Sequence, residues 1–149
     1  MMVEFGKKVL IIGYGSVSRC TIPMLLKHVK VPYKNITVID FADMHKDIKV
    51  WTERGVKYYQ TKLTPVNLAA ELSKHVSAGG LLIDLGWNIG CIDIVTWCHK
   101  NKVLYINTSV EQWDPYTEIH TKSPLEKSLY YRQMKLREAT AKWNNHSTT

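Results

Sequence analysis

The chain has 149 residues, 45% of them hydrophobic and 22% charged, which suits a globular protein with a core of its own. Its formal charge of +7 would fit a nucleic-acid partner, but the basic residues are scattered and no nucleic-acid-binding motif is present, so we expect none. No apolar run is long enough to cross a membrane, and residues 1–5 lack the pattern of a secretory signal. The three cysteines, Cys20, Cys91 and Cys98, predict neither a disulfide framework nor a zinc site, and we expect a cytoplasmic location.

Short apolar runs alternate with amphipathic stretches along the chain. The apolar runs predict five strands, at 8–12, 36–40, 56–60, 81–85 and 103–107. The stretches between them have apolar residues at helical spacing and predict helices at 16–30, 44–54, 65–76 and 92–101, followed by a last helix over about 124–143. This alternation predicts an α/β fold, a Rossmann-type doubly wound parallel sheet with strand order 3-2-1-4-5.

Two prolines bear on the limits of the predicted helices. Pro23 falls inside the first helix, and because its ring removes one backbone donor and clashes with the preceding turn, we expect a bend or a shortened helix there. Before the third helix, Thr64 is placed to cap the helix and Pro65 to occupy its first turn, where the missing N–H would have no partner.

A glycine turn follows the first predicted strand, in the run Gly13-Tyr14-Gly15-Ser16-Val17-Ser18. Gly13 permits a sharp turn out of the strand, and Gly15 removes the side chain that would otherwise separate the backbone from a pyrophosphate. The N–H groups of Ser16, Val17 and Ser18 lie at the positive end of a helix, where they favour an anion. Ser18 stands where dinucleotide folds usually have a third glycine, and it is small enough for close packing. The pattern predicts a dinucleotide site.

The second predicted strand ends in Asp40, where a carboxylate accepts hydrogen bonds from a ribose diol and repels a 2′-phosphate. This favours NAD over NADP as the cofactor, although Lys46 nearby remains able to neutralise a phosphate. The alternative is a strand-to-helix turn in another α/β protein, one that binds a mononucleotide or nothing. The order of strand, glycine turn, helix and strand-end acid favours the dinucleotide.

The loops at 86–90 and 108–115 follow the fourth and fifth predicted strands, so both lie at the carboxyl edge of the sheet, where open α/β sheets bind ligands. After the fifth strand only one long helix follows, without a second region to hold a substrate against a nicotinamide ring. We therefore expect one cofactor-binding domain over 1–149, ordered over about 7–143, with a polar tail at 144–149 and no substrate domain.

With these motifs in place, the chain resembles homospermidine synthase, within the saccharopine-dehydrogenase-like group. The resemblance rests on the glycine turn, on Asp40, on the runs IDLGWN and LYINTSVEQW, and on the LYY and LRE segments of the last helix. It covers about 8–142 and matches the amino-terminal domain of that family. It implies NAD-dependent, redox-neutral transfer, in which hydride leaves the carbon beside an amine of putrescine, ammonia is lost, a second putrescine condenses, and the hydride returns to give homospermidine.

The resemblance also implies roles for residues of the two loops. Glu111 matches a family acid beside the cofactor and is the candidate for positioning the reacting amine. Asn88 matches a position that is aspartate in typical bacterial members, so one substrate-facing charge is absent. Trp87 and Thr108 are candidate cofactor contacts, and no metal is expected. The alternatives are a surface carboxylate for Glu111 and core packing for Trp87. Asp84, at the end of the fourth predicted strand, is either a catalytic acid or a buried acid bonded to backbone amides.

Three classes of function stay open. The first is the cofactor domain of a homospermidine-forming transferase, as an amino-terminal piece or as half of a split enzyme. The second is an oxidoreductase of the same group acting on an amino acid. The third is a non-catalytic nucleotide-binding or interaction module, which the length of the chain favours. Glu111 favours a diamine, since an amino acid would also call for an arginine, and these loops contain none. The rest of the family's substrate pocket is missing, so we expect no turnover of putrescine by this chain alone. The expected partners are NAD, a putrescine-type diamine once a substrate domain is supplied, and a second chain or a homodimer.

Overall fold

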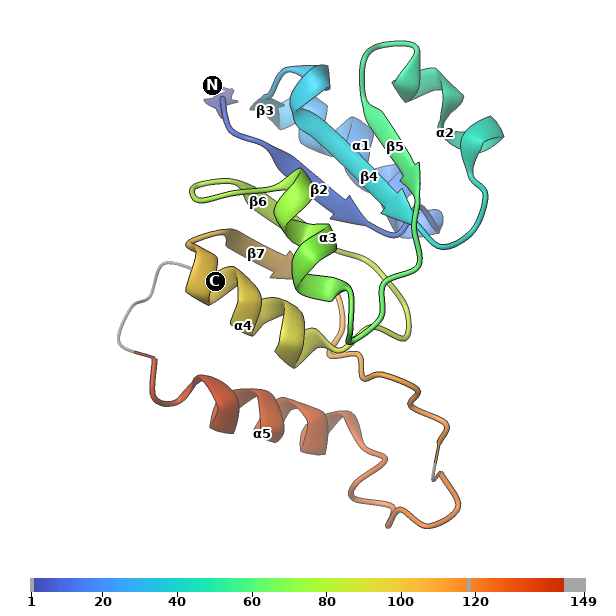
Figure 1. The fold of residues 1–149 in the computed structure, drawn as a ribbon, viewed down its shortest axis with the longest axis vertical. Helices are drawn as coiled ribbons and strands as arrows, with labels where there is room; N and C mark the ends of the chain where they lie inside the picture. The colour runs from blue at the N-terminus through green and yellow to red at the C-terminus, as the bar shows by residue number, and fades with distance from the viewer. Residues whose placement is uncertain (1, 118, 144–149) are drawn as a thin grey trace.

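The computed structural model of the protein describes residues 2–117 and 119–143. Its main sheet has five strands, β2 (Val9–Ile12), β4 (Ile36–Asp40), β5 (Lys57–Gln60), β6 (Leu81–Asp84) and β7 (Leu104–Asn107). Their order is β5-β4-β2-β6-β7, which confirms the predicted order 3-2-1-4-5. All four strand pairs are parallel, so the C-terminal ends of the strands share one edge of the sheet (Figure 1).

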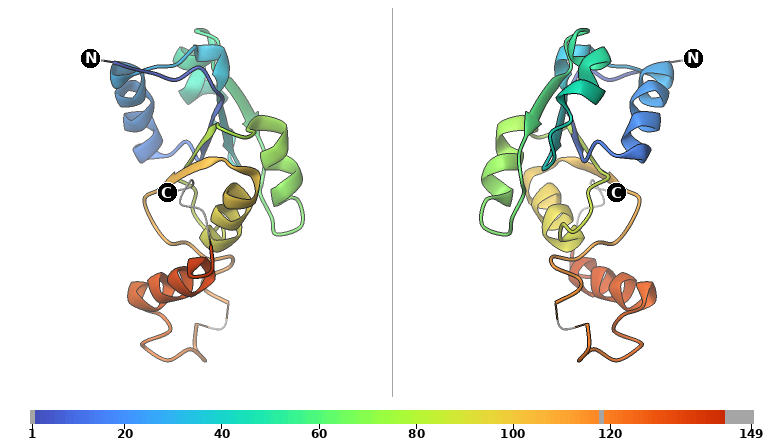
Figure 2. Two further views of the ribbon diagram at one scale, coloured as in Figure 1. Left: turned by 90° about the vertical axis from the view of Figure 1, so that its left-hand side faces the viewer. Right: turned by 90° about the vertical axis from the view of Figure 1, so that its right-hand side faces the viewer.

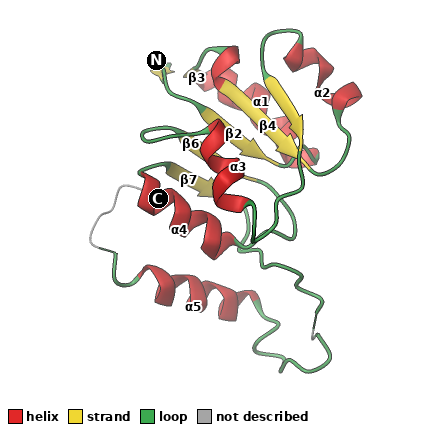
Figure 3. Ribbon diagram, in the orientation of Figure 1, coloured by secondary structure: helices red, strands yellow, loops and turns green. Residues whose placement is uncertain are grey.

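Helices cover both faces of the sheet, as predicted for a doubly wound fold. One core lies under α1 (Ser16–His28) and α2 (His45–Thr52), and the other under α3 (Leu68–His75) and α4 (Cys91–Asn101). Figure 2 shows α1 and α3 on opposite sides of the sheet, and Figure 3 shows the same layers by type of element. Successive residues of β2 enter opposite cores and are fully buried, which explains why that strand is a continuous apolar run.

The predicted end of the first helix is wrong by two residues. The helix stops at His28, and β3 (Val29–Lys30) follows, pairing in parallel with β1 (Val3–Glu4) in a separate two-stranded sheet. Two-residue strands are too short to show a period in the sequence, so neither was predicted. Pro23 lies inside the helix, which continues past it for five residues, so the expected shortening does not occur there. A 3-10 turn at Tyr33–Asn35 leads into β4.

The third helix begins at Leu68 rather than at Pro65. The Thr64 N–H donates to Asn67 Oδ1 at 2.8 Å, and the Asn67 N–H donates back to Thr64 Oγ1 at 3.3 Å. This reciprocal pair closes a turn of its own ahead of the helix, with the logic of a capping box. The prediction found the right residues but placed them in the helix instead of in the turn before it.

The last helix, α5 (Leu129–Thr140), also begins later than predicted. Ser128 caps it by accepting a hydrogen bond from the Tyr131 N–H at 3.1 Å. The helix lies beside α4, where Leu136 and the later Trp143 pack against the α3–α4 core (Figure 1). The predicted polar tail at 144–149 lies outside the described residues. Within residues 2–117 and 119–143, none of the helices combines the length and hydropathy needed to cross a bilayer.

Candidate functional site

A cleft of about 350 Å³ opens at the edge of the sheet where β2, β4 and β6 end. This volume is within the range of small-molecule sites, and the position is where open parallel sheets bind ligands. The glycine turn after β2 and the loops after β4, β5 and β6 all contribute to its lining. Of the predicted cofactor contacts, Gly13, Gly15, Asp40 and Trp87 line this cleft, and the predicted catalytic Asn88 lines it too.

Gly13 is required by the packing of the chain itself. Its φ of +88° lies in the region that favours glycine, and a Cβ at this position would lie 2.8 Å from the Leu85 carbonyl oxygen. The Gly13 N–H donates to the Ile39 carbonyl at 2.8 Å. The turn is therefore held between the end of β4 and the loop after β6, which brings both loops to the cleft.

Gly15 has a different reason to be glycine. Its φ of −79° suits any residue, and a Cβ built on it meets nothing within 4 Å. Neither the backbone conformation nor a neighbouring atom excludes a side chain, yet the position lines the cleft. The position therefore leaves room for a ligand to approach the backbone, as the sequence pattern predicts for a pyrophosphate.

The N-terminus of α1 faces the glycine turn without a side-chain cap. Gly15 is the N-cap residue and has no side chain, so among the described residues no side-chain cap binds the first N–H groups of the helix. Ser16 and Val17 are exposed, whereas Ser18 is fully buried and its hydroxyl donates to the Gly13 carbonyl. Ser18 thus packs the helix onto the turn, and only its backbone N–H remains available to an anion.

Asp40 joins the glycine turn after β2 to the loop after β4. Its Oδ2 accepts the Tyr14 N–H at 2.6 Å, and its Oδ1 accepts the Ala42 N–H at 2.8 Å. The side chain is 8% exposed and lines the cleft. A carboxylate has about four acceptor positions, so roughly two remain for a ribose diol. The sequence predicted the position of this acid, but not that it also holds the glycine turn.

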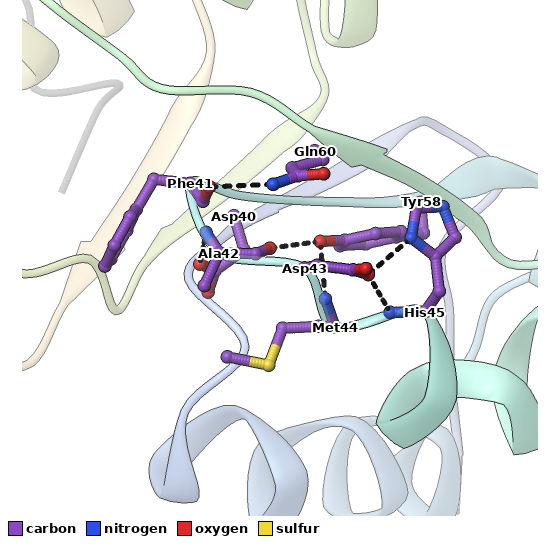
Figure 4. A network of polar contacts seen from close by, with 8 residues as sticks. All are labelled: Asp40, Phe41, Ala42, Asp43, Met44, His45, Tyr58 and Gln60. Carbon is purple, nitrogen blue, oxygen red and sulfur yellow. Dashed lines mark hydrogen bonds and ion pairs between the residues drawn. The ribbon is translucent and has the colours of Figure 1, made fainter.

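The loop after β4 is fixed by side chains of β5, which the sequence analysis did not single out. The Tyr58 hydroxyl donates to the Ala42 carbonyl at 2.6 Å and accepts the Met44 N–H at 3.0 Å, and Gln60 Nε2 donates to the Phe41 carbonyl at 3.3 Å (Figure 4). Burial raises the pKa of Tyr58, so its hydroxyl remains a donor at neutral pH. A strand tyrosine has no sequence signature of this role, because only the register of β4 and β5 brings it under the loop.

A second cavity of about 180 Å³ adjoins the cleft, and Trp87 lines both. Glu111 lies here, half-buried, with its Oε1 accepting the Ser109 hydroxyl at 3.1 Å. Asn88 lines the larger cleft instead, with φ of 60° and an Oδ1 that is buried and has no partner among the described residues. Thr108 is exposed and lines neither cavity, so the structure does not bring this predicted contact to the cleft.

Basic side chains also reach the second cavity, from parts of the chain that the sequence analysis did not connect with it. Arg132 of α5 lines it together with Lys122 and Lys127. An Arg132 guanidinium N–H donates to the Val110 carbonyl at 3.4 Å, and its Nε is buried without a partner among the described residues. The loops contain no arginine, as noted above, but packing of α5 places one beside Glu111.

Asp84 ends β6 directly beneath the loop that lines the cleft. Its Oδ1 accepts the Gly86 N–H at 3.2 Å, and its Oδ2 accepts the Tyr105 hydroxyl at 3.0 Å, so the expected bonding to a backbone amide is confirmed. Burial raises the pKa of Asp84 to about 6. Tyr105 is also 3.4 Å from Cys91 Sγ, and the Cys91 N–H donates to the Glu111 carbonyl at 3.0 Å. A continuous buried network therefore joins the two loops.

The chain was compared with known proteins. Residues 9–149 match the family profile described as the saccharopine dehydrogenase NADP-binding domain. The chain is similar to homospermidine synthase of Mesorhizobium japonicum, 35% identical over 113 residues, which are 74% of this chain and 23% of that protein. It is also similar to homospermidine synthase of Blastochloris viridis, 32% identical over 108 residues, which are 70% of this chain and 22% of that protein.

A solved structure of homospermidine synthase from Legionella pneumophila, in complex with NAD, shares the fold. The TM-score is 0.75 at 19% identity, and the match covers 98% of this chain and 28% of that one. The present chain thus spans about a quarter of the length of its relatives. Because the family profile covers almost the whole chain, the protein belongs to the saccharopine dehydrogenase NADP-binding domain family, as a nicotinamide-dinucleotide-binding domain of the kind found in homospermidine synthases.

Proposed function

We propose that this chain is the cofactor-binding unit of a homospermidine-synthase-like enzyme and that it prefers NAD to NADP. The observation that carries the proposal is the open space at Gly15, the N-cap residue of α1, where a Cβ would meet no described atom within 4 Å, in a cleft that Asp40 also lines. The N–H groups of Ser16, Val17 and Ser18 would hold the pyrophosphate, and Asp40 the adenosine ribose. A bound dinucleotide would supply a hydride acceptor at its nicotinamide end.

The preference for NAD rests on Asp40. Its carboxylate is held in place by two backbone N–H groups, so it cannot swing away from a 2′-phosphate without breaking both bonds. Lys62 also lines the cleft, and its positive charge would reduce the repulsion between Asp40 and a 2′-phosphate. Lys46, which the sequence suggested for this role, does not line the cleft. A fixed acid close to the ribose outweighs an exposed lysine, because burial strengthens its field and solvent screens the lysine.

Isothermal titration of the purified chain with NAD and with NADP tests the proposal. We expect NAD to bind with a dissociation constant at least about ten-fold lower than that of NADP, the effect of one like-charge contact of about 1.4 kcal/mol. The folded state is checked by circular dichroism in the same buffer. A folded protein that gives no heat with either nucleotide would end the proposal, and tighter binding of NADP would overturn the assignment of Asp40.

We further propose that Glu111 holds the ammonium group of an amine substrate, as a putrescine-type diamine would present it. Glu111 is half-buried beside Trp87, which lines both the cofactor cleft and the second cavity, so an amine held by Glu111 adjoins the bound cofactor. Asn88 offers an unpaired buried oxygen on the cleft side. We propose that further polypeptide, for example a second chain or a homodimer partner, completes the substrate pocket, because the matched region covers only 22–23% of the curated relatives.

A second candidate, an enzyme acting on an amino acid, is favoured by Arg132. Its guanidinium lies in the same cavity as Glu111, an arrangement that suits a ligand with both a carboxylate and an ammonium group. The sequence argument against an amino acid depended on the absence of such an arginine near the loops. A cytoplasmic location is proposed on separate grounds, because Cys20, Cys91 and Cys98 are all free thiols and a reducing compartment keeps them so.

Putrescine and ornithine distinguish the two substrates, because ornithine is putrescine with an added carboxylate. With NAD in excess, we expect putrescine to shift the Trp87 indole resonance in two-dimensional NMR spectra, and Glu111→Gln to weaken this binding by about ten-fold or more. The Arg132→Gln variant is the matched control and should leave putrescine binding unchanged. If ornithine binds more tightly than putrescine and Arg132→Gln removes the difference, the amino-acid candidate replaces the diamine.

A further inference from the structure

The buried carboxylate of Asp84 has no counterion among the residues that the structure describes. Its two partners, the Gly86 N–H and the Tyr105 hydroxyl, are both neutral, and the side chain is 5% exposed. A buried charge without a counterion is costly, and buried ionisable groups beside a cleft are concentrated at functional sites. Asp84 is not needed to complete the sheet, because Leu82 and Ile83 already supply the apolar contacts of β6.

The position of Asp84 relative to the cleft indicates which part of a ligand it faces. A dinucleotide lies across the point where the strand order reverses, so its two halves lie toward opposite sides of β2. Asp40 at the end of β4 marks the adenosine side, and β6 is the strand on the other side of β2. The loop that lines the cleft on that side, from Leu85 to Ile89, begins directly after Asp84. Asp84 therefore lies beneath the nicotinamide side.

We propose that Asp84 is a positioning residue that makes the site prefer the oxidised, cationic nicotinamide ring over the reduced, neutral one. The inference rests on the proposed function, that is, on dinucleotide binding in this cleft. Its physical basis is the field of a fixed negative charge in a region of low dielectric, which stabilises a positive ring and does nothing for an uncharged ring. Asp84 does not itself line the cleft, so it acts through its electric field and through Gly86, which lines the cleft and donates its N–H to Asp84.

The thiols and the hydroxyl that face Asp84 from neighbouring elements do not change their charge between pH 5 and 7.5. Burial raises the pKa of Tyr105 on β7 and of Cys91 on α4, and it raises the pKa of Cys98 on α4 to about 12, so all three stay neutral at neutral pH. Glu111, on the loop after β7, is the other carboxylate in its electrostatic surroundings. Protonation of Asp84 near pH 6 removes the charge, so the preference for the oxidised form should fall as the pH drops from 7.5 to 5.

The test is the ratio of the dissociation constants of NADH and NAD⁺, measured by isothermal titration for the whole chain and for Asp84→Asn. Asparagine has the same shape and keeps both contacts, with its oxygen accepting from Gly86 and its nitrogen donating to Tyr105. We expect the variant to lose roughly three- to ten-fold in affinity for NAD⁺ while its affinity for NADH is unchanged, and to show no pH step in the ratio. Glu138→Gln, an exposed change of equal charge on α5, should leave the ratio as in the unmodified chain.

Two further measurements keep the outcome decisive. Glu111→Gln should retain the pH step, and loss of the step in that variant would assign it to Glu111 and overturn the inference. If Asp84→Asn does not fold, the pH profile of the unmodified chain still decides, since a ratio that is constant between pH 7.5 and 5 contradicts the role of Asp84. Failure of both nucleotides to bind the folded chain would instead refute the proposed function.

Discussion

Gly15→Val is expected to abolish dinucleotide binding while leaving the stability of the protein almost unchanged. The valine side chain projects into open space, because a Cβ at this position meets nothing within 4 Å and the backbone is in an ordinary extended conformation. It occupies the space assigned to the pyrophosphate and blocks the N–H groups at the start of α1. Loss of two charge-assisted hydrogen bonds, about 3 kcal/mol, lowers the affinity for NAD by roughly 100-fold or more.

Gly13→Ala is the matched control, and it should show the opposite pattern of stability. Alanine at φ +88° is strained, and its Cβ lies 2.8 Å from the Leu85 carbonyl oxygen. The two effects together should lower the free energy of unfolding by about 3 kcal/mol. Urea unfolding followed by fluorescence measures both variants. A large stability loss in Gly15→Val, or undiminished NAD binding by it, contradicts the idea that the space at Gly15 is kept open for a ligand.

Asp40→Ala is expected to reduce both stability and cofactor selectivity. Removal of the carboxylate leaves the N–H groups of Tyr14 and Ala42 without an acceptor, which should lower the free energy of unfolding by roughly 2–4 kcal/mol. Thermal unfolding checks this, because each kcal/mol lost lowers the Tm of a protein of this size by about 2–4 °C. The preference for NAD over NADP should disappear as well, because the charge that repels the 2′-phosphate is gone.

Asp43→Ala provides the comparison for this variant in the same loop. Its carboxylate is exposed and, within residues 2–117 and 119–143, bonds only to His45, so both its effect on stability and its effect on selectivity should be much smaller. If Asp40→Ala changes stability and selectivity much more than Asp43→Ala, the effects come from the position of Asp40 and not from the total negative charge of the loop. If Asp40→Ala is as stable as the unmodified chain and still prefers NAD, both roles of Asp40 are wrong.

The order of the elements and the cofactor end of the site were predictable from the sequence. Strand and helix periods follow directly from side-chain spacing, and parallel strands joined by helices have few possible topologies, which is why the strand order was predicted correctly. Gly13, Gly15 and Asp40 were singled out because dinucleotide binding needs those residue types at fixed spacing within a short stretch of chain, and all three line the cleft. The predicted starts of α3 and α5 were less accurate. Threonine and serine, as at Thr64 and Ser128, favour turns and helix caps equally, so the sequence does not distinguish a turn before a helix from the helix start itself.

The second cavity, which Glu111 lines, could be recognised only from the tertiary structure. Arg132 reaches the cavity of Glu111 only because α5 packs beside α4, and no local pattern in the sequence records that contact. Tyr58 supports the loop after β4 only through the register of two strands, and the pKa of Asp84 is raised mainly by burial and also by the nearby charge of Glu111. Periodicity and turn chemistry act over a few residues and can be deduced from the sequence. Burial, the pairing of charges and the convergence of distant loops depend on the whole packed chain, and so only the folded structure decided them.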